Sequence, residues 1–502
     1  MRHLARLVLL LSCSSLALAC GDDGTAAGAS NVDDATASVD LGPTDDVAVV
    51  EDTGPSVVAS DDTTLVEGAI DAAPDVPEDV ATDLEPEADT VDSPDVFVEA
   101  DGDVGCAPQC DGKACGPDGC GSVCGYCDAS SPVCLQGICQ PYCPTCAQHG
   151  TVYAPEGTIP IQGAIVWATF EPPAPFPDQV FCDTCIDLPK NTPVGISNAE
   201  GKFLVPIPTE GQWHLVVQKG TFRRVTVIDV KAGGTELPKS VTTLPGKTDL
   251  AKGEEVPKMA VVADSFDLIE NTLAKLGMGK LDTSGYLEPG TEGFDLIDSN
   301  DAAEFFSEWT NLAQYHVIFM PCDSDWFFPA LDSVEVRDNV RKFVEAGGRL
   351  YVTDWSYDIL KAAFPDPIQW FGDTGSNGSA QLSLSFDGKA QVQDEGLGAW
   401  LDKQNLKTFD LLANYTIIES VSEYEAPDVD GTLTKMTPKV WMNIVTPNEG
   451  SRPATVSFQY GCGRGLFSTY HSEDGDGFLP QEKTLAYILF EVAVCAETKY
   501  GL

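Results

Sequence analysis

The stretch HVIFMPCDSDWFFPALDSVEVRDNVRKFVEAGGRLYVTDW, residues 316–355, decides the fold of the carboxyl-terminal part of the chain. It begins with an apolar run at 316–320, continues through a helix predicted at 334–346, and returns to an apolar run at 349–353. Gly347 and Gly348 follow the helix, where glycine commonly ends one. Apolar strands that alternate with helices predict a doubly wound α/β sheet of the flavodoxin-like kind.

The same alternation continues on both sides of this passage. Further strands are predicted at 259–263, 294–298 and 466–470, and further helices at 268–276, around 305–309 and at 482–494. These elements predict one α/β domain over residues 256–502.

Ligands of doubly wound sheets bind beyond the carboxyl ends of the strands. Polar or reactive side chains follow four of the predicted strands in this chain, and we expect them to lie at one edge of the sheet. The candidate ligand-facing residues are Asp264, Cys322, Asp323, Asp354, Trp355, Ser356, His471 and Glu473.

Residues 316–354, together with the passage Gly461-Cys-Gly-Arg-Gly-Leu-Phe-Ser-Thr-Tyr-His-Ser-Glu473, resemble the class I glutamine amidotransferase-like fold. The resemblance covers about 240 residues, with a large insertion between 371 and 453, and extends to relatives without amidotransferase activity. Active members need a cysteine on the turn after the strand that ends here at Thr353, activated by the histidine and oriented by the glutamate. Asp354-Trp-Ser356 occupies that turn instead. The resemblance therefore implies a catalytically silent domain, in which His471 and Glu473 are structural.

Two other side chains could replace the missing nucleophile. Ser356 lacks the Gly-x-Ser-x-Gly surroundings of an exposed nucleophile. Cys322 follows the strand that ends at Met320, on the ligand side, and an extracellular hydrolase using Cys322 with His471 is the alternative function. A buried thiol is more commonly inert. Cysteine parity leaves Cys322 unpaired if the disulfide-rich module pairs internally and the other pairs are Cys182 with Cys185 and Cys462 with Cys495.

Short alternating strands with Gly and Pro turns predict a β-sandwich over residues 148–245. The segment resembles the carboxypeptidase regulatory-like domain, a transthyretin-like sandwich, through Ser197-Asn-Ala-Glu-Gly-Lys-Phe203 and Trp213-His-Leu-Val-Val217. The resemblance implies a turn glycine with positive φ and a phenylalanine in the core, and no zinc ligands. An insertion at 171–193 contains Cys182-Asp-Thr-Cys185, for which a loop disulfide is expected, with a redox dithiol or half of a metal site as alternatives.

Ten of the 17 cysteines lie in residues 106–147, which contain few apolar side chains. Cross-links must replace a hydrophobic core here, so five disulfides are expected. A zinc ribbon with knuckles at Cys124/Cys127 and Cys143/Cys146 is the alternative; neither a metal nor a cofactor is expected for this chain. The segment resembles short Cys-rich modules of bacterial surface lipoproteins. The predicted disulfide cysteines are Cys106, Cys110, Cys115, Cys120, Cys124, Cys127, Cys134, Cys139, Cys143, Cys146, Cys182 and Cys185.

The amino-terminal fifth of the chain predicts export and anchoring. Arg2 and Arg6 precede an apolar run at 7–11, and Ala17-Leu-Ala-Cys20 resembles a lipobox. We therefore expect a lipoprotein signal peptide at 1–19, with Cys20 lipidated. Residues 21–105 contain 25 acidic and no basic residues, so 20–105 is expected to be a disordered acidic linker.

The formal net charge of −49 excludes a nucleic-acid partner, because no basic surface exists to neutralise phosphates. The combined interpretation is a lipid-anchored protein of the cell envelope, exposed on the outer membrane. Its expected activity is binding or assembly with an envelope protein or glycan, and a spacer that binds nothing is a further alternative.

Overall fold

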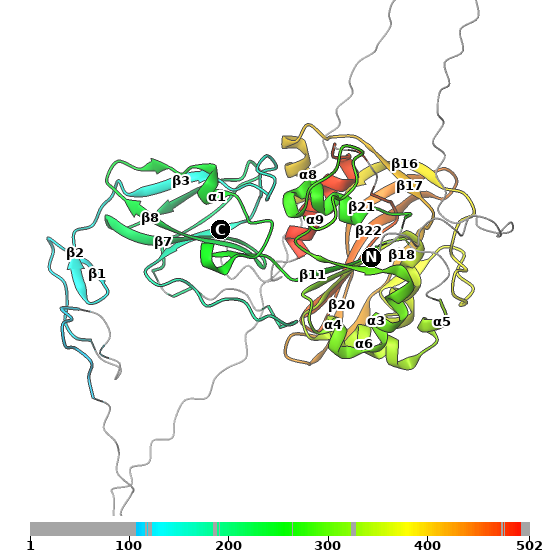
Figure 1. Ribbon diagram of the computed structural model, residues 1–502, viewed down its shortest axis with the longest axis horizontal. Coiled ribbons are helices and arrows are strands. Elements are labelled where there is room, and N and C mark those ends of the chain that lie inside the picture. Colours follow the sequence, from blue (N-terminus) through cyan, green and yellow to red (C-terminus); the bar gives the residue numbers. More distant parts are fainter. Residues whose placement is uncertain are drawn as a thin grey trace, which may run out of the picture. The chain divides into compact units, whose positions relative to one another are not determined.

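The computed structural model describes residues 107–115, 118, 123–183, 188–189, 191–263, 265–322, 328–472, 475 and 477–492 (Figure 1). All of these belong to one of the two units into which the chain divides. The predicted signal peptide, Cys20 and the acidic linker lie outside the described residues. The same holds for Asp264, Asp323, Glu473, Cys106, Cys120, Cys185 and Cys495.

Disulfides hold the cysteine-rich segment, as its composition predicts. The hairpin of β1 (Val133–Leu135) and β2 (Ile138–Gln140) is its regular structure among the described residues. Cys124 and Cys127 belong to two different disulfides, so they do not form a zinc knuckle. The described pairs are Cys110–Cys124, Cys115–Cys134, Cys127–Cys139 and Cys143–Cys146.

Two sheets follow. The first has the order β10-β8-β7-β4-β5 and the second the order β6-β3-β9. Figure 1 labels β7 and β8 of the first sheet and β3 of the second. Their strands are β3 (Ala147–Thr151), β4 (Ile165–Thr169), β5 (Val194–Ile196), β6 (Lys202–Pro206), β7 (Gly211–Lys219), β8 (Phe222–Val230), β9 (Thr235–Glu236) and β10 (Glu254–Glu255). The short helices α1 (Lys239–Thr242) and η1 (Leu250–Lys252) lie between β9 and β10.

The turn before β6 has the features that the sequence predicts. Gly201 has a φ of 72°, which favours glycine. The Asn198 side chain accepts hydrogen bonds from the backbone N–H groups of Glu200 and Lys202. Phe203 then points into the core, with 5% of its surface exposed. This turn, which leads from β5 of the first sheet to β6 of the second, therefore helps to anchor the second sheet.

The carboxyl-terminal part contains a mixed sheet of nine strands, in the order β12-β11-β13-β14-β23-β22-β21-β16-β17. The first five strands in this order, from β12 to β23, pair in parallel with their neighbours. The pairs from β23 to β17 are antiparallel. The parallel strands are β11 (Met259–Ala263), β12 (Asp295–Asp298), β13 (Val317–Met320), β14 (Arg349–Thr353) and β23 (Gly463–Ser468).

Helices cover both faces of the parallel half, which explains why its strands are apolar throughout. In β13, Val317 and Phe319 face the core beside α9, whereas Ile318 and Met320 face the core beside α6. Helices α3, α4 and α6 lie next to one another, as do α8 and α9 (Figure 1). The helices are α2 (Ile269–Leu273), continued by η2 (Ala274–Met278), then η3 (Ser299–Asp301), α3 (Ala302–Ser307), α4 (Trp309–Leu312), α5 (Phe328–Leu331), α6 (Val334–Glu345), η5 (Asp354–Ser356), α7 (Tyr357–Ala363), α8 (Glu395–Lys403) and α9 (Pro480–Val492). Among the described residues, no helix combines the length and the apolar character needed to cross a bilayer.

The region between 371 and 453, expected to be an insertion, supplies most of the antiparallel half of this sheet. Its strands there are β16 (Phe386–Val392), β17 (Asp410–Asn414), β21 (Lys439–Thr446) and the start of β22 (Gly450–Tyr460). Two small antiparallel pairs complete the architecture: β15 (Ile368–Trp370) with β18 (Ile418–Val421), and β19 (Tyr424–Pro427) with β20 (Leu433–Met436).

The predicted Cys182–Cys185 and Cys462–Cys495 pairs are wrong, because Cys182 is bonded to Cys462, 280 residues away. The segment 171–183, here called the strap, leaves the sandwich and runs along the α/β domain. Its Val180 N–H donates to the Ala313 carbonyl, and Asp183 pairs with Arg349 at 3.2 Å. Because these contacts hold the strap against the α/β domain, Cys182 reaches Cys462 in the turn before β23.

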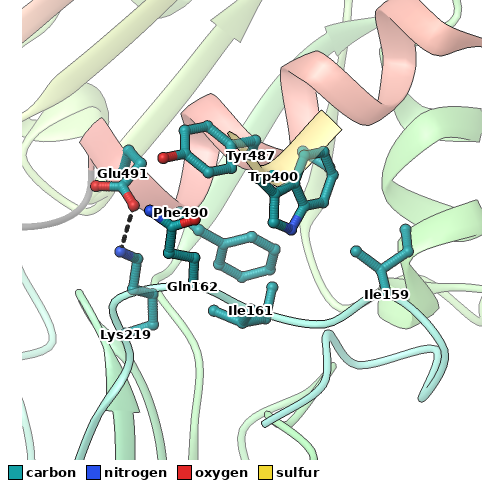
Figure 2. A pocket seen from close by; sticks show the side chains of 9 residues that line it. Ile159, Ile161, Gln162, Lys219, Trp400, Tyr487, Phe490 and Glu491 are labelled. Atoms are coloured by element: carbon teal, nitrogen blue, oxygen red, sulfur yellow. Dashed lines mark hydrogen bonds and ion pairs between the residues drawn. The ribbon is translucent and has the colours of Figure 1, made fainter. Parts of the chain in front are cut away.

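A second contact between sandwich and α/β domain involves α8 and α9 (Figure 2). The Lys219 ammonium lies 2.6 Å from the Glu491 carboxylate, and the Trp400 indole N–H donates to the Pro160 carbonyl at 2.7 Å. Figure 2 shows Ile161 and Phe490 between these polar contacts. Apolar packing and an ion pair therefore join the two parts in addition to the strap.

Candidate functional site

The carboxyl ends of four parallel strands bring four reactive side chains together. Asp267 follows β11, Cys322 follows β13, Asp354 follows β14 and His471 follows β23. All four are buried. The Cys322 sulfur, a carboxylate oxygen of Asp354 and a ring nitrogen of His471 all lie within 4.8 Å of one another. The predicted edge of the sheet is thus where these side chains meet.

Asp354 occupies the turn directly after β14. Its φ of 41° lies in the left-handed region, which is strained for a residue other than glycine. The short helix η5 begins at Asp354 and leads directly into α7. The backbone therefore has the strand-turn-helix course of a nucleophile elbow, with an aspartate at its tip.

The Asp354 carboxylate is hydrogen-bonded through both oxygens. Oδ1 accepts from the Thr416 hydroxyl at 2.6 Å, and Oδ2 accepts from the Tyr415 backbone N–H at 2.9 Å. The His471 Nε2 atom lies 3.1 Å from Oδ2. Burial raises the pKa of Asp354 above its ordinary value, although the contacts with His471, Thr416 and Tyr415 favour the ionised form.

His471 is held on several sides. Its ring stacks on that of Tyr415, with centroids 5.6 Å apart, and its backbone carbonyl accepts from the Gln481 side chain at 2.5 Å. Only 4% of its surface is exposed. These contacts fix the ring against Asp354 rather than toward solvent.

Cys322 is disulfide-bonded, and its partner lies outside the described residues. The expectation of an unpaired Cys322 is therefore wrong. It assumed the Cys462–Cys495 pair, which the Cys182–Cys462 bond excludes. Because only a thiolate is a nucleophile or a metal ligand, the bonded sulfur can be neither.

Asp267 is a site residue that the sequence reasoning missed. Its Oδ2 accepts from the Thr353 hydroxyl at 2.5 Å, and its Oδ1 accepts from the Ser472 backbone N–H at 2.8 Å. Thr353 Oγ1 in turn accepts from the Cys322 backbone N–H at 2.8 Å. Asp267 thus links the loops after β11, β14 and β23. Its position just past a predicted strand was the available signal.

Trp355 and Ser356 also hold loops together. The Trp355 indole N–H donates to the Tyr415 carbonyl at 3.2 Å, and the Ser356 hydroxyl donates to the Pro321 carbonyl at 2.6 Å. Both residues are buried. The polar atoms of both side chains thus bond to neighbouring loops, and their role toward a ligand stays a prediction.

The cavity beside His471 has room for about one water molecule. Asp267, Tyr351 and Thr353 line it, together with Gln481 and Glu482 at the start of α9. Glu482 is itself paired with Lys275 at 2.7 Å, and both side chains are buried. The space beside His471 is thus water-sized, not substrate-sized.

The cluster does not suit a metal ion in this state of the chain. Of the three side chains with metal-ligand spacing, Cys322 is in a disulfide, and the oxygens of Asp354 already accept hydrogen bonds. Only His471 would remain as a ligand, whereas metal sites use several side chains.

No protein-family model matches the chain, and no curated protein resembles it in sequence. Among solved structures, the GH42 β-galactosidase Gan42B from G. stearothermophilus is 16% identical over 48% of this chain and 30% of its own, with a TM-score of 0.24. The β-galactosidase from Rahnella sp. R3 is 15% identical over 48% of this chain and 32% of its own, with a TM-score of 0.27. The cytoplasmic protein STM3548 from Salmonella typhimurium is 12% identical over 47% of this chain and 98% of its own, with a TM-score of 0.28. The chain thus spans about a third of these β-galactosidases, and scores this low identify neither a shared fold nor a shared activity.

Proposed function

We propose that the chain is a lipid-anchored protein of the cell envelope that acts by binding or assembly. In this proposal its α/β domain is a catalytically silent, flavodoxin-like relative of the class I glutamine amidotransferases, and the sandwich is of the carboxypeptidase regulatory-like kind. The lipobox-like Ala17-Leu-Ala-Cys20 and the disulfides support an exported protein. The parallel strands with helices on both faces are consistent with this fold.

One observation supports the hypothesis that the α/β domain is catalytically silent. Asp354 stands at the elbow, and both of its carboxylate oxygens accept hydrogen bonds from the protein. An oxygen held this way, in a buried side chain, cannot approach a substrate carbon without breaking those bonds. His471 faces this carboxylate, so its ring serves the same internal network. Asp354 and His471 are thus arranged to join loops of the protein to one another.

The alternative is an extracellular hydrolase that uses Cys322 with His471. The distance supports it, since the Cys322 sulfur lies within 4.8 Å of a His471 ring nitrogen. The disulfide at Cys322 opposes it, because the sulfur would first have to be reduced.

The two functions are separated by assaying the purified full-length chain on ester, amide and glutamine substrates, with and without reductant. We expect no turnover in either condition. Hydrolysis that disappears in both His471→Ala and Cys322→Ser, with circular dichroism showing intact folds, would establish the hydrolase and overturn the silent reading.

A further inference from the structure

Strand β12 is the last strand at one edge of the nine-stranded sheet. Among the described strands it pairs with β11 alone, in parallel, with Leu296 opposite Val261. Its other edge therefore presents backbone N–H and C=O groups without a strand partner in the described part of the chain. Such an edge is a template for an added strand.

A groove of about 420 Å³ lies beside this strand. Leu296, Ile297 and Phe305 give it apolar surface, and 43% of Leu296 is exposed. Residues of α3 and α4 and of the turn after α4 supply the rest of its lining, and in that turn the Tyr315 hydroxyl donates to Asp295 of β12 at 2.9 Å. The groove is thus an open channel along the strand, unlike the water-sized cavity beside His471.

The negative charge of the groove indicates which kind of ligand it would bind. Asp298, Asp301 and Glu304 line it, and no lysine or arginine is among the described lining residues. Hydrogen bonds from Asn300 lower the pKa of Asp298, so this carboxylate is ionised at neutral pH. Lys258 is not among the lining residues; its ammonium lies 5.1 Å from the centre of the Tyr315 ring. The groove therefore suits positive charge.

A second copy of the chain does not fit. Two copies joined through β12 would bring the same carboxylates face to face, and the chain as a whole has a net charge of −49. Acidic residues on an edge strand protect it against pairing with its own kind. They do not repel a basic strand.

We propose that β12 and its groove bind an extended, basic segment of a partner protein, which adds to the sheet as a further strand. This inference rests on the proposed binding function and names a partner class for it. Backbone pairing would supply affinity, and lysine or arginine at alternate positions would reach the carboxylates. Their methylene stems would pack on Leu296 and Phe305.

The test uses the full-length chain in detergent and three fluorescent ten-residue peptides, measured by fluorescence polarisation at physiological ionic strength. The first alternates Lys and Val, the second alternates Glu and Val, and the third is the Lys peptide N-methylated at every residue, so that neither of its edges has backbone N–H groups to donate. We expect only the first to bind. Equal binding of the N-methylated peptide would overturn strand addition, because it cannot pair along that edge. Absence of binding by the Lys peptide would overturn the site.

The triple variant Asp298→Asn/Asp301→Asn/Glu304→Gln tests the groove itself. Asparagine at 298 retains an acceptor for the Asn300 backbone N–H, so the local turn is preserved. We expect at least tenfold weaker binding of the Lys peptide. The control, Asp366→Asn/Glu395→Gln/Asp430→Asn, changes three exposed carboxylates elsewhere by the same total charge and should change binding less than twofold. Equal weakening by both would assign the binding to net charge and overturn the groove.

Failure here is distinguishable from failure of the proposed function. If the peptide tests fail while the chain remains without hydrolytic turnover, the edge is wrong and the binding function stands. If Cys322-dependent and His471-dependent turnover appears, the silent function is wrong whatever the peptides do.

Discussion

At the scale of single residues, what the site can do depends on which of its polar atoms already form hydrogen bonds within the protein. Asp354 is at the elbow, but Thr416 and Tyr415 occupy its carboxylate oxygens. Both carboxylate oxygens of Asp267 likewise accept hydrogen bonds, from Thr353 and Ser472. Buried acceptors that are all used in this way stabilise loops, and removing one partner leaves another polar group unsatisfied.

His471→Ala should therefore lower the free energy of unfolding by about 1–3 kcal/mol, because it removes a buried partner of Asp354. Urea unfolding followed by tryptophan fluorescence measures the loss. His149→Ala is the matched control, since His149 is exposed on β3, and it should change stability by less than about 0.5 kcal/mol. An unchanged midpoint in His471→Ala would contradict a structural role.

His316 gives the chain a pH dependence. Its Nδ1 accepts from the Lys258 backbone N–H, and its Nε2 lies 3.0 Å from the carbonyls of Pro177 and Gln179, so the neutral ring with Nε2–H fits. Burial lowers the pKa of His316, with Arg349 and Lys258 acting in the same direction. The unfolded chain therefore binds this proton at a higher pH than the folded chain does.

The stability from His316 is accordingly complete above about pH 6.5, the unfolded pKa, and is lost as pH falls through the lower folded value. The slope should reach at most about 1.4 kcal/mol per pH unit. His316→Asn, which cannot titrate, should flatten the curve of unfolding free energy between pH 7 and 5. His149→Asn should leave the curve unchanged; an equal flattening in that control would disprove the assignment.

At the scale of elements, the strap changes how the parts are joined. Nothing in the sequence of the strap predicts that it lies on the α/β domain. Here its Cys182 bonds to Cys462, and its carbonyls at 177 and 179 meet His316. The link from sandwich to α/β domain is thus covalent at a second point, far from the peptide connection.

Cys182→Ser/Cys462→Ser should destabilise the folded chain by up to about 5 kcal/mol, because the disulfide closes a loop of roughly 280 residues in the unfolded chain. Urea unfolding under oxidising conditions measures the effect. The control pair Cys143→Ser/Cys146→Ser removes a disulfide of sequence separation 3 and should leave the unfolding of the α/β domain unchanged. Equal stability of the strap variant and the native chain would show that the bond constrains nothing.

Disulfides, not zinc, should hold the cysteine-rich module. Reductant is expected to open residues 107–146 to protease, whereas EDTA leaves them protected, because the described cysteines of the module are paired with one another. Mass spectrometry of the fragments gives the cleavage sites. Opening by EDTA alone would instead reveal a structural metal.

At the scale of the whole molecule, the proposed membrane anchoring depends on one residue. Cys20→Ser should release the chain from the membrane fraction, because several acyl chains on one residue hold a protein where a cleaved signal cannot. Cys13 lies within the predicted signal peptide, so Cys13→Ser is the matched control and should remain membrane-bound. Fractionation followed by immunoblotting gives the result, and full retention of Cys20→Ser would refute the lipoprotein interpretation.

Periodicity in the sequence was sufficient for the parallel strands, their helices and the edge at which polar residues gather. The predicted strand 349–353 is β14 without change, and the predicted helix 334–346 is α6 within one residue. These features depend on neighbours within a few residues, which is what a local pattern records. The cysteine count likewise sufficed for a disulfide-held module, because a segment with few apolar residues has no other means of staying folded.

Tertiary structure alone decided the partners of the site and the joint between the domains. Tyr415 and Thr416 reach Asp354 only because the region between 371 and 453 extends the sheet, and Cys182 meets Cys462 only because the strap lies along the α/β domain. Such contacts join segments tens to hundreds of residues apart, and their pairing depends on how whole elements pack. No local pattern records that choice, since many closures of similar entropic cost are open to the unfolded chain.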